Sequence, residues 1–271
     1  MPELPEVETT LRGVQPLVEK KFVSAVVVRQ RRLRWPVPRG LHRQVCGKKI
    51  LSVTRRAKYI LLRFTHGTLM IHLGMSGRLR ALPVGVPPGK HDHVDLVLSN
   101  GRVLRFHDPR RFGSVLWVNG DPFESPLLVH LGPEPFDEGF SGRMLFEAAR
   151  GRRMAVKNFI MDGRIVVGVG NIYASEALFR AGIRPSRPAG RVALHRYECL
   201  VQAVRVVLSE AIAAGGTTLR DYTQVTGEPG YFEQALQVYK RAGEPCVDCG
   251  SVIRRKVIGQ RTSYYCADCQ Y

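Results

Sequence analysis

Short hydrophobic runs, rich in valine, leucine and aromatic residues, recur between residues 22 and 118. They are FVSAVVV (22–28), YILLRF (59–64), TLMIHL (68–73), VDLVLS (94–99), RVLRF (102–106) and SVLWV (114–118). Turn-forming pairs follow two of them, His66-Gly67 and Asn100-Gly101, and an Asn-Gly pair is a strong signal for a two-residue β-hairpin. Many short strands joined by turns predict an antiparallel sandwich or barrel.

Elsewhere the hydrophobic positions follow a helical period. Residues 7–18 show it directly behind Pro5, which suits the first turn of a helix. Residues 194–212 trace one apolar face of a long helix that ends before Gly215-Gly216. A further helix is expected from Asn171, a good N-cap residue, to Gly182. The Pro-, Gly- and acid-rich stretch 119–140 separates the β-rich part from the helical part, so we expect the domain boundary there.

The charge of the chain is unusual. It has 41 Lys and Arg against 23 Asp and Glu, a net charge of +18, and these residues are spread through folded-looking segments. A polyanion, most commonly nucleic acid, is the natural partner, while a ribosome-like or membrane-surface protein is the alternative. Because no apolar run could span a bilayer and the acidic N-terminus has no apolar h-region of a signal peptide, we expect a cytoplasmic protein.

Four of the six cysteines form two pairs near the C-terminus. Cys246 and Cys249 lie 16 residues before Cys266 and Cys269, so the spacing is C-x2-C, x16, C-x2-C, with a predicted hairpin between the pairs. Four thiolates predict one structural Zn²⁺ with no open coordination position; two disulfides or a redox pair are the alternative. Cys46 and Cys199 stand apart, and we expect them to be small buried residues.

The first residues, MPELPEVE, raise a chemical question. Pro2 and Pro5 could simply preset the backbone of the following helix. If Met1 is removed, however, Pro2 becomes a secondary amine that can form an iminium with a sugar carbon. An α-amino group titrates near 7.7–8.0, so a useful fraction is unprotonated at neutral pH. A second candidate lies in GVGN (168–171), where glycines and a helix N-terminus favour a phosphate.

These motifs together resemble the bacterial formamidopyrimidine-DNA glycosylases, which are 8-oxoguanine glycosylases and AP lyases. The likeness runs through PELPEVE, RRAKY (55–59), HLGMSGRL (72–79), KHDHVDL (90–96), DPRRFG (108–113), LGPEP (131–135), GVGNIYASEALF (168–179) and GGTTLRD (215–221). The resemblance implies an α+β multidomain fold, with DNA in the cleft between domains. Its parts are an N-terminal helix plus antiparallel β-sandwich (1–120), a linker (121–140), a helix–two-turn–helix domain (141–235) and a four-cysteine zinc finger (236–271).

The resemblance also implies roles for single residues. Pro2 would attack C1′ of the damaged nucleotide and expel the base, and Glu3 would act as general acid/base at the sugar, with Glu6 in support. Lys58 would assist β-elimination and Arg261 would donate the proton for δ-elimination. For the two glutamates the alternative is charge complementarity at a helix N-terminus, worth about 0.3–1 kcal/mol. For Lys58 and Arg261 it is an ordinary surface charge.

A base inside a duplex must be flipped out before Pro2 can reach it, so something must fill the gap. Met75, Arg110 and Phe112 match the family's inserting residues, although sheet core is the alternative for Met75 and Phe112. Further DNA contacts are expected from His91, Arg152, Asn171 and His72, the last with a structural alternative. Residues 217–231 match a loop that caps the lesion.

The expected activity is base-excision repair of oxidised purines in double-stranded DNA by a monomer without a small-molecule cofactor. A sister enzyme for oxidised pyrimidines, endonuclease VIII, shares the proline chemistry and the finger. A zinc-ribbon DNA-binding protein without catalysis would explain the charge and the cysteines, but it gives no reason for Pro2 and Glu3.

Overall fold

The computed structural model describes residues 2–216 and 232–271; the predicted lesion-capping loop, 217–231, lies outside them. The chain divides into two compact units, Met1–Val129 with Ala214–Tyr231, and His130–Ala213 with Phe232–Tyr271. The four finer domain ranges expected from the sequence stay a prediction.

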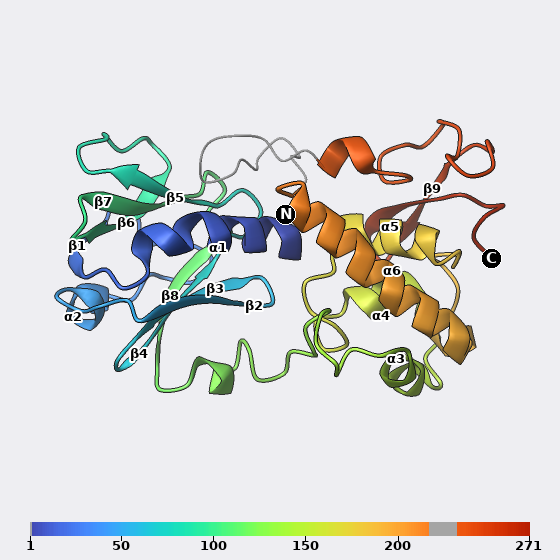
Figure 1. Cartoon of the computed structure of the whole chain (residues 1–271), viewed down its shortest axis with the longest axis horizontal. Coiled ribbons are helices and arrows are strands. Elements are labelled where there is room, and N and C mark those ends of the chain that lie inside the picture. The colour runs from blue at the N-terminus through green and yellow to red at the C-terminus, as the bar shows by residue number, and fades with distance from the viewer. Residues whose placement is uncertain (1, 217–231) are drawn as a thin grey trace. The chain divides into compact units, whose positions relative to one another are not determined.

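The first unit consists of helix α1 and two four-stranded antiparallel sheets (Figure 1). The strand orders are β1-β6-β7-β5 and β2-β3-β4-β8. The elements are α1 (Leu4–Val18), β1 (Val23–Val28), α2 (Leu41–Val45), β2 (Ser52–Arg56), β3 (Tyr59–Phe64), β4 (Gly67–His72), β5 (Arg78–Pro83), β6 (Asp92–Leu98), β7 (Arg102–His107), β8 (Ser114–Asn119) and the short 3-10 helix η1 (Pro122–Glu124). Two separate sheets make a sandwich, so this alternative is confirmed over the barrel.

One hydrophobic core joins the helix to both sheets. The buried face of α1 carries Val7, Leu11, Val14 and Val18, the positions that showed the helical period. They share a cluster with residues of β3, β4, β6 and β7. The predicted β6–β7 hairpin is confirmed, with Val97 opposite Val103, but its connection is three residues long, 99–101, and not the two residues that Asn100-Gly101 predicted. All six predicted strands are present because each buries at least one hydrophobic face in this core.

Strands β2 and β5 and the short helix α2 were not predicted from the sequence. β2 and β5 are edge strands, each paired on one side only. The sequence of β2 is SVTRR, with Val53 as its one fully buried residue. In β5, arginines alternate with the buried Leu79 and Ala81. An edge strand keeps one face and one rim in water, so it needs no continuous apolar run.

The second unit is helical and ends in a two-stranded hairpin. Its elements are α3 (Gly142–Ala149), α4 (Val156–Met161), α5 (Asn171–Arg180), η2 (Ala189–Arg191), α6 (Leu194–Ala213), η3 (Phe232–Ala235), β9 (Arg254–Ile258) and β10 (Arg261–Tyr265). Helix α6 packs on α3 and α5, and α5 contacts β10 (Figure 1). The predicted α5, α6 and finger hairpin are confirmed. Helices α3 and α4 were missed because eight and six residues hold too few turns to show a period.

The start of α5 differs from expectation. Its N-cap is Gly170, and Asn171 is the first helical residue, so the prediction of Asn171 as N-cap was wrong. The amide of Asn171 is instead engaged in contacts with other segments. The end is as predicted: Gly182, at φ +66°, follows the C-cap residue Ala181.

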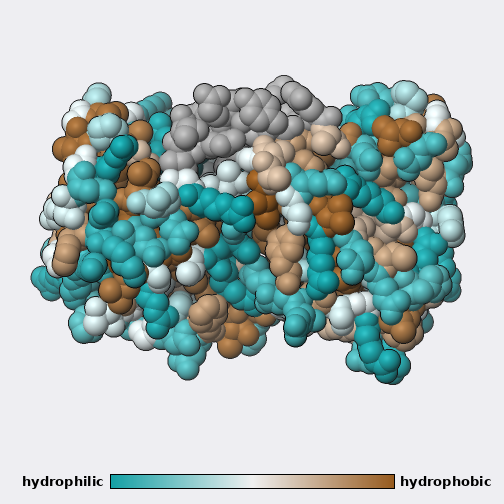
Figure 2. All heavy atoms as spheres, viewed as in Figure 1, coloured by the Kyte–Doolittle hydropathy of each residue, from teal (hydrophilic) through white to brown (hydrophobic). Residues whose placement is uncertain are grey.

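Hydrophilic residues cover much of the face shown in Figure 2, broken by small hydrophobic groups. Among the helices of the described residues, none has the length and apolar character to cross a membrane. Cys199 is exposed on α6 and Cys46 is half-buried, so the expectation that both are buried was wrong. On a helix, a thiol at an outward position is simply left in solvent.

Candidate functional site

The N-terminus of α1 holds two buried carboxylates. Glu3 and Glu6 are each 3% exposed and form a capping box. The Glu3 N–H donates to Glu6 Oε2 at 2.8 Å, and the Glu3 side chain accepts from the Glu6 backbone N–H. Pro2, directly before them, is buried as well. The helix-terminus role weighed for both glutamates is therefore present, and it leaves Glu3 fixed beside Pro2.

A cationic cluster surrounds the end of β4. Lys58 lies in the turn between β2 and β3, and His72 closes β4. Burial, with the positive charges of Lys58 and Arg34, lowers the pKa of His72 to about 4. Its Nδ1 accepts a hydrogen bond from the Gly74 N–H at 3.0 Å, and its ring lies 4.8 Å from that of Tyr59. His72 is thus a neutral imidazole that can donate only from Nε2, while Lys58 supplies a charge beside it.

The three residues expected to fill the gap left by a flipped base lie on two loops of the first unit. Met75 is half-buried between β4 and β5, and Phe112 is 45% exposed between β7 and β8. The exposed Arg110 guanidinium lies 4.9 Å from the centre of the Phe112 ring. Burial in the sheet core, the alternative for Phe112, does not hold. His91, before β6, is half-buried, with its ring 5.9 Å from that of His107.

A buried lysine, not foreseen from the sequence, lies beside Asn171. Lys157 of α4 is completely buried; its Nζ donates to Asn171 Oδ1 at 2.7 Å and to Ser263 Oγ at 2.8 Å. Asn171 Nδ2 donates to the Thr262 carbonyl at 3.1 Å. Asn171 is therefore tied to α4 and to the finger hairpin. The sequence held one signal for this site, a lysine within the largely apolar stretch VKNFIM. A lysine is almost never fully buried unless it is paired, so a buried lysine at this position implies polar partners from elsewhere in the chain.

A second unforeseen residue is Glu176 of α5, which is 1% exposed. Its carboxylate accepts from the backbone N–H groups of Gln237, Val238 and Tyr239 at 2.8, 3.0 and 2.8 Å. Burial raises its pKa, although the three hydrogen bonds act in the opposite direction. Glu176 thus fixes the segment that leads into the finger.

Two predicted site residues of the second unit, the catalytic Arg261 and the DNA-contacting Arg152, are exposed arginines. Arg261 opens β10, after the turn formed by Gly259 and Gln260. Arg152 precedes α4; its Nε donates to the Ala148 carbonyl at 2.7 Å and its guanidinium lies 5.6 Å from the Phe159 ring centre. Arg261 directly precedes Thr262, whose carbonyl accepts the hydrogen bond from Asn171. Arg152 instead contacts Ala148 of α3 and Phe159 of α4.

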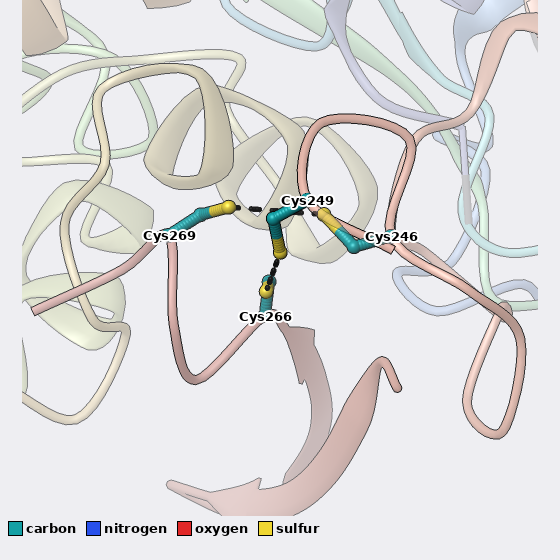
Figure 3. A group of neighbouring side chains, drawn as sticks. All are labelled: Cys246, Cys249, Cys266 and Cys269. Carbon is teal, nitrogen blue, oxygen red and sulfur yellow. Dashed lines mark hydrogen bonds between the residues drawn. The ribbon is translucent and has the colours of Figure 1, made fainter. Parts of the chain in front are cut away.

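The four C-terminal cysteines converge on one point (Figure 3). All four Sγ atoms lie within 4.8 Å of one another; Cys246 to Cys269 is 3.8 Å and Cys249 to Cys266 is 3.5 Å. Thiolates about 2.3 Å from a tetrahedral Zn²⁺ lie about 3.8 Å apart, whereas a disulfide needs about 2.05 Å. The donor set therefore fits one structural zinc ion, and the thiols are not paired as disulfides.

Comparisons with known proteins agree along the whole chain. Three family profiles match: the formamidopyrimidine-DNA glycosylase N-terminal domain at residues 1–115, the formamidopyrimidine-DNA glycosylase H2TH domain at 131–223, and a zinc finger found in FPG and IleRS at 243–270. The formamidopyrimidine-DNA glycosylase of Syntrophotalea carbinolica is 62% identical over 270 residues, covering 100% of both chains. That of Alkalilimnicola ehrlichii is 61% identical over 276 residues, with the same coverage.

Solved structures show the same fold. The crystal structure of the MutM (Fpg) protein from Thermus thermophilus matches at a TM-score of 0.88, with 40% identity, over 99% of this chain and 98% of that one. The complex of a Lactococcus lactis Fpg mutant with Fapy-dG-containing DNA matches at 0.92, with 29% identity, over 99% of each chain. The complex of Lactococcus lactis Fpg with DNA containing an abasic site matches at 0.91, with 29% identity and the same coverage. With this agreement in sequence, domain order and fold, the chain belongs to the formamidopyrimidine-DNA glycosylase family.

Proposed function

We propose that this protein is a base-excision repair enzyme, a glycosylase and AP lyase that removes 8-oxoguanine and formamidopyrimidines from double-stranded DNA. The observation that carries this function is the 62% identity over the full chain with a relative that bears the name of this activity. Solved relatives that hold damaged DNA, with Fapy-dG or an abasic site, support the substrate class. The net charge of +18 suits a polyanionic partner. We place the activity in the bacterial cytoplasm, where the chromosome lies, and in a monomer.

The chemistry begins at Pro2. Once Met1 is removed, the lone pair of the Pro2 nitrogen attacks C1′, and the bond from C1′ to the damaged base breaks. Glu3, fixed by its capping box, protonates the sugar ring oxygen, and the ring opens to an iminium between Pro2 and C1′. Glu3 donates this proton from its carboxylic acid form, and because its residue is 3% exposed, little water competes with the sugar for it.

The iminium makes the proton on C2′ acidic. Glu3, which is a carboxylate after the first step, takes up this proton, and the 3′ phosphate leaves by β-elimination with Lys58 beside it as a cation. A second proton loss expels the 5′ phosphate by δ-elimination, with Arg261 as the proton donor. Asn171 holds a neighbouring phosphate, and its orientation is set by Lys157 and the Thr262 carbonyl. The zinc ion supplies no chemistry; its four thiolates hold the hairpin that carries Arg261.

The experiment that tests this function is borohydride trapping on a duplex with one 8-oxoguanine. The wild-type protein should form a covalent adduct with the DNA, because borohydride reduces the iminium. Pro2→Gly with Met1 retained should form none. Pro16→Ala is the matched control, since Pro16 is an exposed proline further along α1. No trapping by wild type, or trapping by the Pro2 variant, contradicts the proposal.

A second duplex distinguishes the substrate class. Excision of thymine glycol in preference to 8-oxoguanine would assign the chain to oxidised pyrimidines. Mass spectrometry of an active preparation should find Pro2 as the first residue, and an active protein that still carries Met1 would exclude the mechanism.

A further inference from the structure

Two loops of the first unit touch through their backbones. One comprises residues 73–77, between β4 and β5, and the other comprises 108–113, between β7 and β8. Gly74 has a φ of +68°, and a Cβ atom on it would lie 2.4 Å from both the carbonyl carbon of Phe112 and the nitrogen of Gly113. Only glycine allows this approach. The two backbones are therefore in direct contact at this point, and no side chain fits between them.

A buried carboxylate reinforces this contact. Asp108 is 0% exposed; its Oδ1 accepts from Ser76 Oγ at 2.8 Å and its Oδ2 accepts from the Gly113 N–H at 2.8 Å. Ser76, 4% exposed, also accepts from the Arg110 N–H at 3.3 Å. Among the ion pairs formed within residues 2–216 and 232–271, none includes Asp108. Its side-chain bonds run to neutral donors, one on each loop.

The backbone of Asp108 ties in a third segment. Its N–H donates to the His91 carbonyl at 2.9 Å. Its carbonyl oxygen lies 2.7 Å from His93 Nε2, within hydrogen-bond distance. His91, just before β6, and His93, within it, are thus held to the same residue.

The backbone of the second loop is itself constrained. Arg111 has a φ of +55°, in the left-handed region, and its N–H donates to the Asp108 carbonyl at 3.3 Å. A left-handed non-glycine residue persists only where its surroundings hold it. Of its two neighbours, Arg110 has its guanidinium carbon Cζ 4.9 Å from the centre of the Phe112 ring.

We propose that Asp108 is a positioning residue that locks Met75, Arg110 and Phe112 into one preassembled wedge. The proposal rests on the function proposed above, in which these three side chains fill the space of the flipped base. A wedge that is already ordered loses little conformational entropy when it enters the duplex. Asp108 and Ser76 touch no DNA in this scheme; they act through the two loops, and so they serve base eversion rather than bond breaking.

The test compares variants that cut or keep this link. Asp108→Ala and Ser76→Ala remove it. Asp108→Asn keeps it, because the amide can donate to Ser76 Oγ while its oxygen still accepts from the Gly113 N–H. Leu62→Ala is the control for lost stability, since Leu62 is 0% exposed in the core of the same unit and lies on β3, opposite Leu69 of β4.

Two readouts separate positioning from general damage. The first is stopped-flow fluorescence of 2-aminopurine placed next to 8-oxoguanine, which brightens when the base stack opens. The second is single-turnover cleavage of 8-oxoguanine duplex against duplex with a preformed abasic site, where no base has to leave the stack. Asp108→Ala and Ser76→Ala should slow opening and excision about tenfold, because the wedge no longer offsets the cost of unstacking. Abasic-site cleavage should change by less than about threefold, and Asp108→Asn should restore opening.

Several outcomes overturn the inference. Normal opening in both alanine variants means that the loops do not need the link. Equal losses on both DNA substrates, or the same pattern in Leu62→Ala, mean that Asp108 serves stability alone. If wild type itself excises no oxidised purine, the proposed function fails and the inference fails with it. If wild type excises and the alanine variants behave normally, only the inference fails.

Discussion

The stability of the first unit should depend on pH through His72. In the folded protein its pKa is lowered to about 4, first by burial and then by Lys58 and Arg34. In the unfolded chain it returns to about 6.5. The unfolded state therefore binds the extra proton between pH 6.5 and 4, and stability falls as the pH drops through this window. The cost is about 0.2 kcal/mol at pH 7, about 2 kcal/mol at pH 5, and at most about 3.4 kcal/mol below pH 4.

Urea unfolding followed by tryptophan fluorescence measures this effect. The chain has two tryptophans, Trp35 and Trp117, and both belong to the same unit as His72. His72→Asn keeps an acceptor for the Gly74 N–H and removes the titrating ring. The unfolding free energy of the variant minus that of wild type should rise by about 2 kcal/mol when the pH is lowered from 7 to 5. His66→Asn, at an exposed position in the β3–β4 turn, is the matched control.

Carboxylates contribute to the same pH dependence, so the comparison is made as a difference between two proteins. Burial alone would raise the pKa of Glu8, but the hydrogen bonds and positive charges of Arg55 and Arg12 together outweigh burial and lower it. Such groups are present in wild type and variant alike and cancel. The reasoning is refuted if the stability difference between variant and wild type is the same at pH 7 and pH 5, or if NMR shows His72 titrating near pH 6.5.

Three further substitutions test the second unit. Cys266→Ser should reduce zinc from one ion per chain to none after dialysis against EDTA, measured by metal analysis; retained zinc would contradict the four-thiolate site. Glu176→Gln should cost about 1–3 kcal/mol, because one oxygen loses its charge and its acceptor role, and hydrogen exchange should rise at 237–239. Lys157→Met should weaken DNA binding about tenfold in anisotropy titrations, because Asn171 loses the donor that orients it, and the lost hydrogen bonds to Asn171 and Ser263 should also cost about 1–3 kcal/mol of stability. A large loss of stability without a loss of binding would assign Lys157 to the core instead of to Asn171.

The sequence alone determined those elements whose cause is local. Helix α6 followed from its apolar face, and the β6–β7 hairpin followed from Asn100-Gly101. The zinc site followed from the spacing of Cys246, Cys249, Cys266 and Cys269, because each C-x2-C pair brings two thiolates to one turn. The family followed from motifs in the right order along the whole chain.

Only the tertiary structure decided which side chains meet across long distances in the chain. Lys157 lies 106 residues before Ser263, and Asp108 lies 32 residues after Ser76, yet each pair forms a 2.8 Å hydrogen bond. Burial of these polar groups is stable only because the partners are present, and no local pattern encodes a distant partner. The edge strands β2 and β5 escaped for a related reason, since their pairing depends on neighbours and not on their own hydrophobicity. Local periodicity thus specified the elements, whereas the contacts between them specified the site.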